Sequence, residues 1–492
     1  MKKIFSILLI SLLFLSGCKS NLSLDSVSRD LDTYKMEIEY NDEEKYLSVQ
    51  QNFEYKNRTD TTLTELYFHL YPNAFSEGAV NKPVGILSSE KAYPNGKSYG
   101  GINILSTSSK NSKLSHTVEG IDKDFLKVSL PKEIAPDESI NIDFEYTVKI
   151  PNINHRFGFG NNTVNIANFY PVIAIYEDDW VLDPYHYNGD PFYSNIANYE
   201  ILLTIPTNLT LASTGEILGK NEEENKTTYN ISAKAVRDYA FVLSDKFKVL
   251  SEQVGKTTVS YFSYEEENPE EFLKASVDSL TTFNSLFGEY PYSTLSVVKS
   301  NFVHGGMEYP NLVLISDAVT EKADYINVIV HEIAHQWWYG LVGNNQFEHG
   351  WLDEGLTEYS TNLFYEKNPE YGISANEIIK NTTSSFANFV ELYTSVLGNV
   401  DTSMNRALDE YDTEPEYVYI TYVKGMLFFN ELRNILGYDK FISCLQDYFE
   451  TYKFKLVKPE HMLGSFEKTS HTDLSGFFNS WISGKVLIES SN

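Results

Sequence analysis

The chain has 492 residues, a formal net charge of -29 at pH 7 and two cysteines. At about 100–200 residues per domain, this length indicates two or three domains. The hydrophobic content of 42%, with 30 Phe and 35 Tyr, excludes wholesale disorder. The acidic composition excludes a nucleic-acid-binding protein, which needs a basic surface, and two cysteines exclude a disulfide framework. We expect an acidic, globular, multidomain protein that binds no nucleic acid.

The first 18 residues have the pattern of an export signal. Two lysines precede an apolar run over residues 4–15, which has signal-peptide length and is too short to span a bilayer comfortably. The run ends in the sequence LSGC, which resembles the lipobox of bacterial lipoproteins, in which cleavage precedes a cysteine that becomes lipidated. We predict a signal peptide at 1–17, lipidation of Cys18 and a tether over 18–32. The protein is then exported and lipid-anchored on the extracytoplasmic face of the bacterial cell membrane; the alternative is an ordinary signal peptide with a chance cysteine.

The segment after the tether has the alternation of half-buried antiparallel strands. Apolar and polar residues alternate with period two, and Pro, Gly and Asn separate the runs. The stretch over residues 85–111, rich in Gly, Ser, Asn and Lys, predicts a long surface excursion. We predict an all-β domain over residues 33–264. Its core-facing positions include Tyr34, Met36, Ile38 and Tyr40, then Leu47, Val49, Phe53 and Tyr55, then Ile140, Ile142, Phe144, Tyr146, Val148 and Ile150, then Tyr199, Ile201, Leu203 and Ile205.

The pattern changes to helical spacing after residue 264. Asn268 and Pro269 suit a helix start, apolar residues then recur at helical spacing, and Gly288 ends the run. We therefore predict a second, mainly helical domain over residues 265–492. Further helices are expected over about residues 323–339 and 353–365, with several more between 375 and 482.

One constellation in the second domain indicates metal chemistry. In His331-Glu332-Ile333-Ala334-His335, the two histidines at i and i+4 lie on one helical face and can present ring nitrogens to one metal. Zinc suits this nitrogen pair, and Glu332 is placed beside the open coordination position. A catalytic zinc needs three protein ligands, and the next helix offers a carboxylate at Glu354, with 18 residues between it and His335.

The motifs together resemble the alanyl aminopeptidase (M-one) family of gluzincin metallopeptidases, which includes the leukotriene hydrolases. The His-Glu-x-x-His motif is followed after 18 residues by the glutamate of the sequence WLDEG at 351–355. Upstream, GGMEY at 305–309 is similar to the family's G-x-M-E-N signature, and downstream YVKG at 422–425 is similar to its Y-x-K-G segment. The clear match covers about residues 287–435. Because 70 residues follow Tyr422 (492 - 422), the resemblance is to a short form without the family's large C-terminal helical domain.

The resemblance implies a fold, a cofactor and an activity. The fold would be multidomain α+β, with an N-terminal all-β, saddle-like domain followed by a thermolysin-like mixed α/β, mainly helical zinc-peptidase domain. The activity would be zinc-dependent removal of N-terminal residues from peptides with a free N-terminus, through a metal-activated water. One catalytic Zn2+ would be bound. The implied site comprises the zinc ligands His331, His335 and Glu354, the catalytic residues Glu332 and Tyr422, and the substrate-binding residues Gly305, Gly306, Met307 and Glu308.

Three of these residues have distinct implied roles. Glu332 would act as the general base toward the attacking water. Tyr422 would donate a hydrogen bond to the oxyanion. Glu308 would pair with the α-ammonium group of the substrate, which restricts cleavage to the N-terminus.

Several positions depart from the family pattern or stay open. Tyr309 stands where the signature usually has Asn, which puts strict exopeptidase action in question. Asn161 or Asn162 could supply a polar group to the ammonium site from the β domain. Glu358, one turn after Glu354, could orient a ligand histidine, although the sequence favours a plain surface glutamate.

Two other functions remain as alternatives. One is a zinc endopeptidase that processes extracellular proteins, and the other is a non-catalytic surface-binding lipoprotein. The negative charge leads us to expect a preference for cationic peptide substrates. The sequence gives no side-chain specificity, oligomeric state or membrane protein partner.

Overall fold

The computed structural model describes residues 23–486. The predicted signal peptide at 1–17, the lipidation site Cys18 and the first part of the tether lie outside the described residues. The rest of the tether contains the short helix α1 (Leu24–Ser28). Within residues 23–486, no helix combines the length and apolar character needed to cross a membrane.

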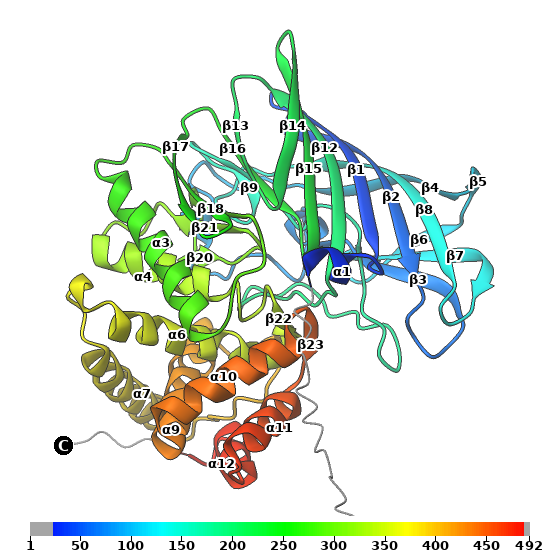
Figure 1. Cartoon of the computed structure of the whole chain (residues 1–492). Helices are drawn as coiled ribbons and strands as arrows, with labels where there is room; N and C mark the ends of the chain where they lie inside the picture. The colour runs from blue at the N-terminus through cyan, green and yellow to red at the C-terminus, as the bar shows by residue number, and fades with distance from the viewer. Residues whose placement is uncertain (1–22, 487–492) are drawn as a thin grey trace, which may run out of the picture.

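Three sheets form the N-terminal half of the molecule, at the upper right of Figure 1. The largest sheet has eight strands in the order β14-β15-β12-β1-β2-β8-β4-β5. Two four-stranded sheets accompany it, in the orders β13-β16-β10-β9 and β11-β3-β7-β6. The strands are β1 (Thr33–Asn41), β2 (Tyr46–Lys56), β3 (Leu63–His69), β4 (Gly101–Ser109), β5 (Ser112–Lys113), β6 (His116–Glu119), β7 (Phe125–Ile134), β8 (Ser139–Lys149), β9 (Phe157–Phe159), β10 (Val164–Ala167), β11 (Val172–Ile173), β12 (Ala197–Pro206), β13 (Thr210–Ser213), β14 (Glu216–Glu223), β15 (Lys226–Val236) and β16 (Ala240–Ser244).

The predicted alternation is confirmed in the eight-stranded sheet. In β1, Tyr34, Met36, Ile38 and Tyr40 are at most 3% exposed, while the residues between them face the other side of the sheet. One prediction for this half is wrong. The expected surface excursion over 85–111 contains β4, which pairs with β8 inside the large sheet and buries Ile102, Thr107 and Ser109.

The C-terminal half combines one five-stranded sheet with most of the helices (Figure 1). The sheet order is β17-β18-β19-β21-β20, so β20 lies at an edge. Strands β17 and β18 precede the predicted domain limit at residue 264, yet β18 pairs in parallel with β19. The strands are β17 (Lys248–Val254), β18 (Thr257–Ser263), β19 (Thr294–Ser300), β20 (Gly306–Met307), β21 (Leu312–Ser316), and the separate pair β22 (Val342–Asn344) and β23 (Lys455–Val457).

The helices of this half include those that the sequence predicted. Helix α3 covers the run after Asn268, and α6 covers the predicted segment near 353–365. The longer helices are α3 (Pro269–Leu286), α4 (Lys322–Ala334), α6 (Glu354–Lys367), α7 (Ala375–Leu397), α9 (Gly425–Leu436), α10 (Tyr438–Tyr452), α11 (Pro459–Ser470) and α12 (Ser475–Ile482). The short ones are α5 (Gln346–His349), η2 (Gly350–Leu352), η3 (Pro369–Tyr371), η4 (Leu408–Glu410), α8 (Glu414–Val418) and the π-helix η5 (Tyr419–Lys424). Two further short helices, η1 (Tyr71–Phe75) and α2 (Ser89–Ala92), belong to the N-terminal half.

The helix predicted over 323–339 is shorter than expected. It ends at Ala334, and the backbone N–H of Gly340 donates to the carbonyl of His335 at 2.9 Å, which closes a turn. Tyr339 has φ of 112°, a value that no helix accommodates. The turn bends the chain back toward the second histidine of the motif, so the early end of α4 belongs to the site described below.

One buried arginine ties the two halves together. Arg237, directly after β15, is 2% exposed and donates to four backbone carbonyls. Its partners are Ser194 in the N-terminal half, and Tyr339, Leu341 and Lys455 in the C-terminal half, at 2.6–3.3 Å. These bonds hold the turn after α4 against the β sheets, which fixes the position of the site between the halves.

Candidate active site

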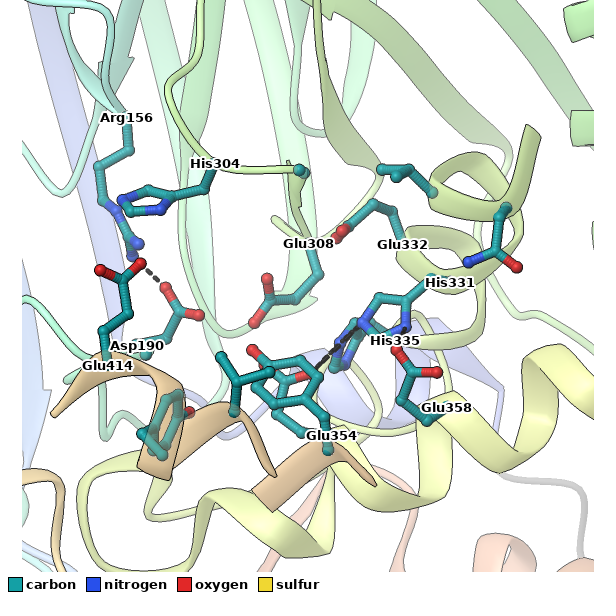
Figure 2. Close-up of a pocket in the computed structure, with 18 of the residues that line it drawn as sticks. Arg156, Asp190, His304, Glu308, His331, Glu332, His335, Glu354, Glu358 and Glu414 are labelled. Carbon is teal, nitrogen blue, oxygen red and sulfur yellow. Dashed lines mark hydrogen bonds and ion pairs between the residues drawn. The ribbon is translucent and has the colours of Figure 1, made fainter. Parts of the chain in front are cut away.

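Helices α4 and α6 carry the predicted metal ligands. The buried Ile326, Ile329, Val330 and Ile333 recur at helical spacing and hold one side of α4 in the core. The histidines of the motif project from the end of this helix toward the first turn of α6, where Glu354 begins the helix. Figure 2 shows these side chains converging on one point.

The separations within this trio match a zinc site. His331 Nε2 lies 3.1 Å from His335 Nε2, and the Oε2 atom of Glu354 lies 3.3 Å and 3.1 Å from these two nitrogens. A tetrahedral zinc with bonds of about 2.0–2.1 Å places its ligand atoms about 3.3 Å apart. Burial alone would raise the pKa of Glu354, but the neighbouring histidines lower it below its usual value, so the carboxylate is available as a ligand.

The other ring nitrogens of both histidines are occupied. His335 Nδ1 lies 2.9 Å from the carbonyl of Trp338, in the turn after α4, and 3.2 Å from the hydroxyl of Thr357. His331 Nδ1 lies 3.2 Å from a carboxylate oxygen of Glu358, which is 30% exposed. The preference for a plain surface glutamate at this position was therefore wrong, because α6 places Glu358 one turn after Glu354 and beside the ring. Such partners orient the rings and leave the Nε2 atoms facing the metal.

Glu332 is a buried carboxylate that points into the same pocket. It is 5% exposed, and its Oε2 atom has no hydrogen-bond partner among the described residues. Burial raises its pKa to about 7. A Cβ atom at Gly306 would lie 2.2 Å from Glu332 Oε1, so the backbone of the edge strand β20 approaches this carboxylate as only glycine allows.

Tyr422 lies on the other side of the ligand trio. Its hydroxyl donates to Glu354 Oε1 at 2.7 Å, and its ring stacks on that of His331. The residue belongs to the π-helix η5, a rare geometry that is frequent at functional sites. Lys424, at the end of this π-helix, is fully buried and donates to the carbonyls of Thr402 and Trp481 at 2.6 Å and 3.1 Å, which anchors the segment.

Glu308 lies beside the ligands within a set of carboxylates. Oxygen atoms of Asp190, Glu308 and Glu354 lie within 4.8 Å of one another. Gln346 Nε2 donates to Glu308 Oε1 and to Asp353 Oδ2, both at 2.8 Å. Burial and the charge of Asp190 raise the pKa of Glu308 well above its usual range. This crowding of acidic groups favours a cationic ligand at this point.

A pocket of about 240 Å³ connects all these groups, and its far side is formed by residues that the sequence did not single out. Asp190 there forms a buried ion pair with Arg156. Arg156 and Asp190 lie in segments far apart in the chain, and no motif spacing in the sequence marks them. The missed residues at the pocket are Arg156, Tyr187, Gly189, Asp190, His304, Asn327, Val328, Glu414, Tyr417 and Val418, with Gln346 behind Glu308.

Four residues named from the sequence lie elsewhere. Met307 is 1% exposed and its side chain packs in the core. Tyr309 is fully buried and donates to Asn168 Oδ1 at 2.8 Å, so it does not reach the pocket. Asn161 and Asn162 also do not line it; the β domain contributes Asp190 there instead. Gly305 and Gly306 both line the pocket.

Comparison with known proteins places this site in a family. Residues 272–481, which contain GGMEY, the His-Glu-x-x-His motif, WLDEG and YVKG, match the Peptidase family M1 domain. This stretch of the chain is a peptidase family M1 domain. The predicted relationship to the alanyl aminopeptidase family of gluzincins is thereby confirmed, and family M1 membership implies one catalytic zinc ion. The ligand trio, with its matching separations, fits that ion.

Sequence relatives of this M1 protein are leucine aminopeptidases. Leucine aminopeptidase 2 of Aspergillus fumigatus is 27% identical over 277 residues, which are 52% of this chain and 43% of that protein. Leucine aminopeptidase 2 of Ajellomyces capsulatus is 30% identical over 229 residues, which are 46% of this chain and 34% of that protein. The chain thus spans less than half the length of these relatives.

A solved structure shares the whole fold. The crystal structure of an M1 zinc metallopeptidase from Deinococcus radiodurans matches with a TM-score of 0.65 at 16% identity, and the match covers 93% of this chain and 94% of that one. The predicted fold class, an N-terminal β domain followed by a mainly helical peptidase domain, is confirmed.

Proposed function

We propose that this M1 protein is a zinc-dependent aminopeptidase that removes N-terminal residues from peptides. One observation carries the proposal: the zinc-ligand trio shares Glu354 with a set of buried carboxylates, Asp190 and Glu308, in a single pocket. A metal held by the trio would therefore lie beside a site for an ammonium group. The names of the leucine aminopeptidase relatives support the same activity.

The residues of the chain have separate tasks in this reaction. A zinc ion at the trio supplies a Lewis acid and lowers the pKa of a bound water. Glu332, whose buried Oε2 atom has no hydrogen-bond partner among residues 23–486, accepts the proton of the attacking water and passes it to the leaving amine. The Tyr422 hydroxyl, which lies at the ligand cluster, donates a hydrogen bond to the developing oxyanion.

Two carboxylates, Glu308 and Asp190, determine which end of the peptide is cleaved. Glu308 and Asp190 bind the free α-ammonium group, so the first peptide bond lies over the zinc ligands. The edge strand β20 offers its unpaired side to the substrate backbone, which extends the sheet by one strand. This arrangement favours an exopeptidase over the endopeptidase alternative, and Tyr309 does not oppose it because its side chain points away.

The test compares substrates that have a free amino group with substrates whose amino group is acetylated. We expect hydrolysis of alanyl- and leucyl-aminomethylcoumarin, its loss with a chelator, and its recovery with zinc. N-acetylated versions should be inert, since they lack the ammonium group. The Glu332→Gln variant should not hydrolyse these substrates, and it therefore serves as the control for a contaminating peptidase. Cleavage of internal bonds in N-acetylated peptides by the wild type would establish the endopeptidase instead, and activity retained in Glu332→Gln would contradict the mechanism.

We also propose that the enzyme acts outside the cytoplasm on a lipid anchor at Cys18. Support comes from the apolar run over residues 4–15 and the LSGC sequence that follows it. In a detergent phase-separation experiment, the full-length protein should partition into the detergent phase. The Cys18→Ala variant should partition into the aqueous phase. Equal partitioning of both forms would contradict the anchor.

A further inference from the structure

The pocket contains more acidic groups than the reaction uses. Five of its six carboxylates have a partner or a task. Asp190 pairs with Arg156, Glu308 accepts from Gln346, Glu354 is a metal ligand, Glu358 orients His331, and Glu332 is the base. Only Glu414 is left over.

Glu414 is partly buried and has no compensating cation. Within residues 23–486, no hydrogen bond or ion pair involves its carboxylate, although it lines the pocket. Among the described residues that line the pocket, Arg156 is the one lysine or arginine, and it is bound to Asp190. Burial raises the pKa of Glu414, as expected for an acid that no cation stabilises.

The surroundings of Glu414 suit a long cationic side chain. A Cβ atom at Gly85 would lie 3.6 Å from Glu414 Oε2 and 3.0 Å from Cδ2 of Tyr187, so the carboxylate and the aromatic ring converge there. Figure 2 shows Glu414 and Asp190 on one side of the pocket, with the zinc ligands on the other. A carboxylate paired with an aromatic ring binds a guanidinium or ammonium group through charge and cation–π attraction.

We propose that the enzyme prefers peptides whose N-terminal residue is arginine or lysine, and that Glu414 is the residue that binds the cationic side chain. This inference rests on the proposed aminopeptidase function, because the α-ammonium group must occupy the site at Asp190 and Glu308. The side chain of the first residue then extends along the same side of the pocket toward Glu414 and Tyr187.

A matched pair of substrates tests the proposal. Arginyl- and citrullyl-aminomethylcoumarin have nearly the same shape and differ in charge, so the ratio of their kcat/KM values isolates the electrostatic contribution. At pH 8 we expect a preference of about 10–100-fold for arginine, the value of one charge-assisted hydrogen bond. Glu414→Gln should reduce this ratio to near one. Asp412→Asn, an exposed carboxylate two residues away and outside the pocket, is the matched control and should keep the full ratio.

The outcomes separate the two proposals. Equal hydrolysis of the two substrates by the wild type would overturn the specificity but leave the aminopeptidase function intact. A full arginine preference in a folded Glu414→Gln would overturn the assignment of Glu414. The wild-type ratio decides the substrate class even where the variant does not fold. No chelator-sensitive hydrolysis of any substrate would overturn both proposals.

Discussion

The two sides of the pocket are built in different ways. The helical wall, made of His331, Glu332, His335, Glu354 and Tyr422, lies on or at the ends of α4, α6 and η5. The recognition wall, made of Tyr187, Asp190, Glu308 and Glu414, comes mostly from loops and element ends. Under the proposed function, regular helices hold the reacting groups, and loops and element ends provide the contacts that select the substrate. Changes in the helical wall should therefore alter the chemical step, and changes in the recognition wall should alter which substrates are used.

The largest expected effect is at Glu332 in the helical wall. Glu332→Gln keeps the shape but removes the base, and should lower kcat by about 100–10,000-fold. Zinc content should stay at one ion per chain, since neither ligand histidine changes. Loss of zinc together with activity would mean that Glu332 supports the metal site, and the division between the walls would fail.

Tyr422 should give the next largest effect. Tyr422→Phe removes the hydroxyl that lies 2.7 Å from Glu354 and should lower kcat by about 100–1000-fold with little change in KM. Steady-state kinetics on one leucyl substrate measure both constants. A rise in KM with unchanged kcat would move Tyr422 to the recognition wall.

The difference between the two walls also explains which residues of the site can be predicted from the sequence. Helical periodicity places His331 and His335 on one face beside Glu332, and the next predicted helix offers Glu354. Tyr422 was predicted only through the resemblance of YVKG to the family's Y-x-K-G segment. Asp190 and Glu414 carry no such signal, because tertiary packing of distant loops brings them together. The β1 alternation predicted buried Tyr34 and Met36, but the Gly- and Ser-rich composition near β4 concealed a strand.

Lys424, which holds the π-helix that carries Tyr422, leads us to expect that the stability of the protein depends on pH. Burial lowers the pKa of Lys424 from 10.5 to about 8. Between these two values, Lys424 is protonated in the unfolded chain and deprotonated in the folded protein. The contribution of Lys424 to the free energy of unfolding therefore rises as the pH increases from about 8 to 10.5, and it is constant below pH 8. Relative to Lys424→Met, the wild-type free energy of unfolding should rise by up to about 3 kcal/mol across this window. Urea titrations at several pH values measure it, and a constant difference would contradict the prediction.

Glu358 tests whether a residue next to the helical wall also contributes to zinc binding. Glu358→Ala removes the partner of His331 Nδ1 and should weaken zinc binding about 10–100-fold. Competition with a chelator measures the Kd. Glu391→Ala, at an exposed position of α7, should leave the Kd unchanged. Equal affinity in all three proteins would make Glu358 a surface residue after all.

Glu308 gives the smallest expected effect and tests the recognition wall. Glu308→Gln keeps an acceptor for Gln346 but loses the charge, and should lower kcat/KM on substrates with a free amine by about 10-fold. Bound zinc should stay at one ion per chain. Loss of zinc together with activity would show that Glu308 supports the metal rather than the ammonium group.

The central claim is that His331, His335 and Glu354 hold one zinc ion, and anomalous diffraction from crystals of the purified protein at the zinc absorption edge tests it most directly. We predict a single strong peak about 2.0–2.2 Å from His331 Nε2, His335 Nε2 and a carboxylate oxygen of Glu354. A zinc peak held by other residues, or none at this trio in crystals of active enzyme, would contradict the account.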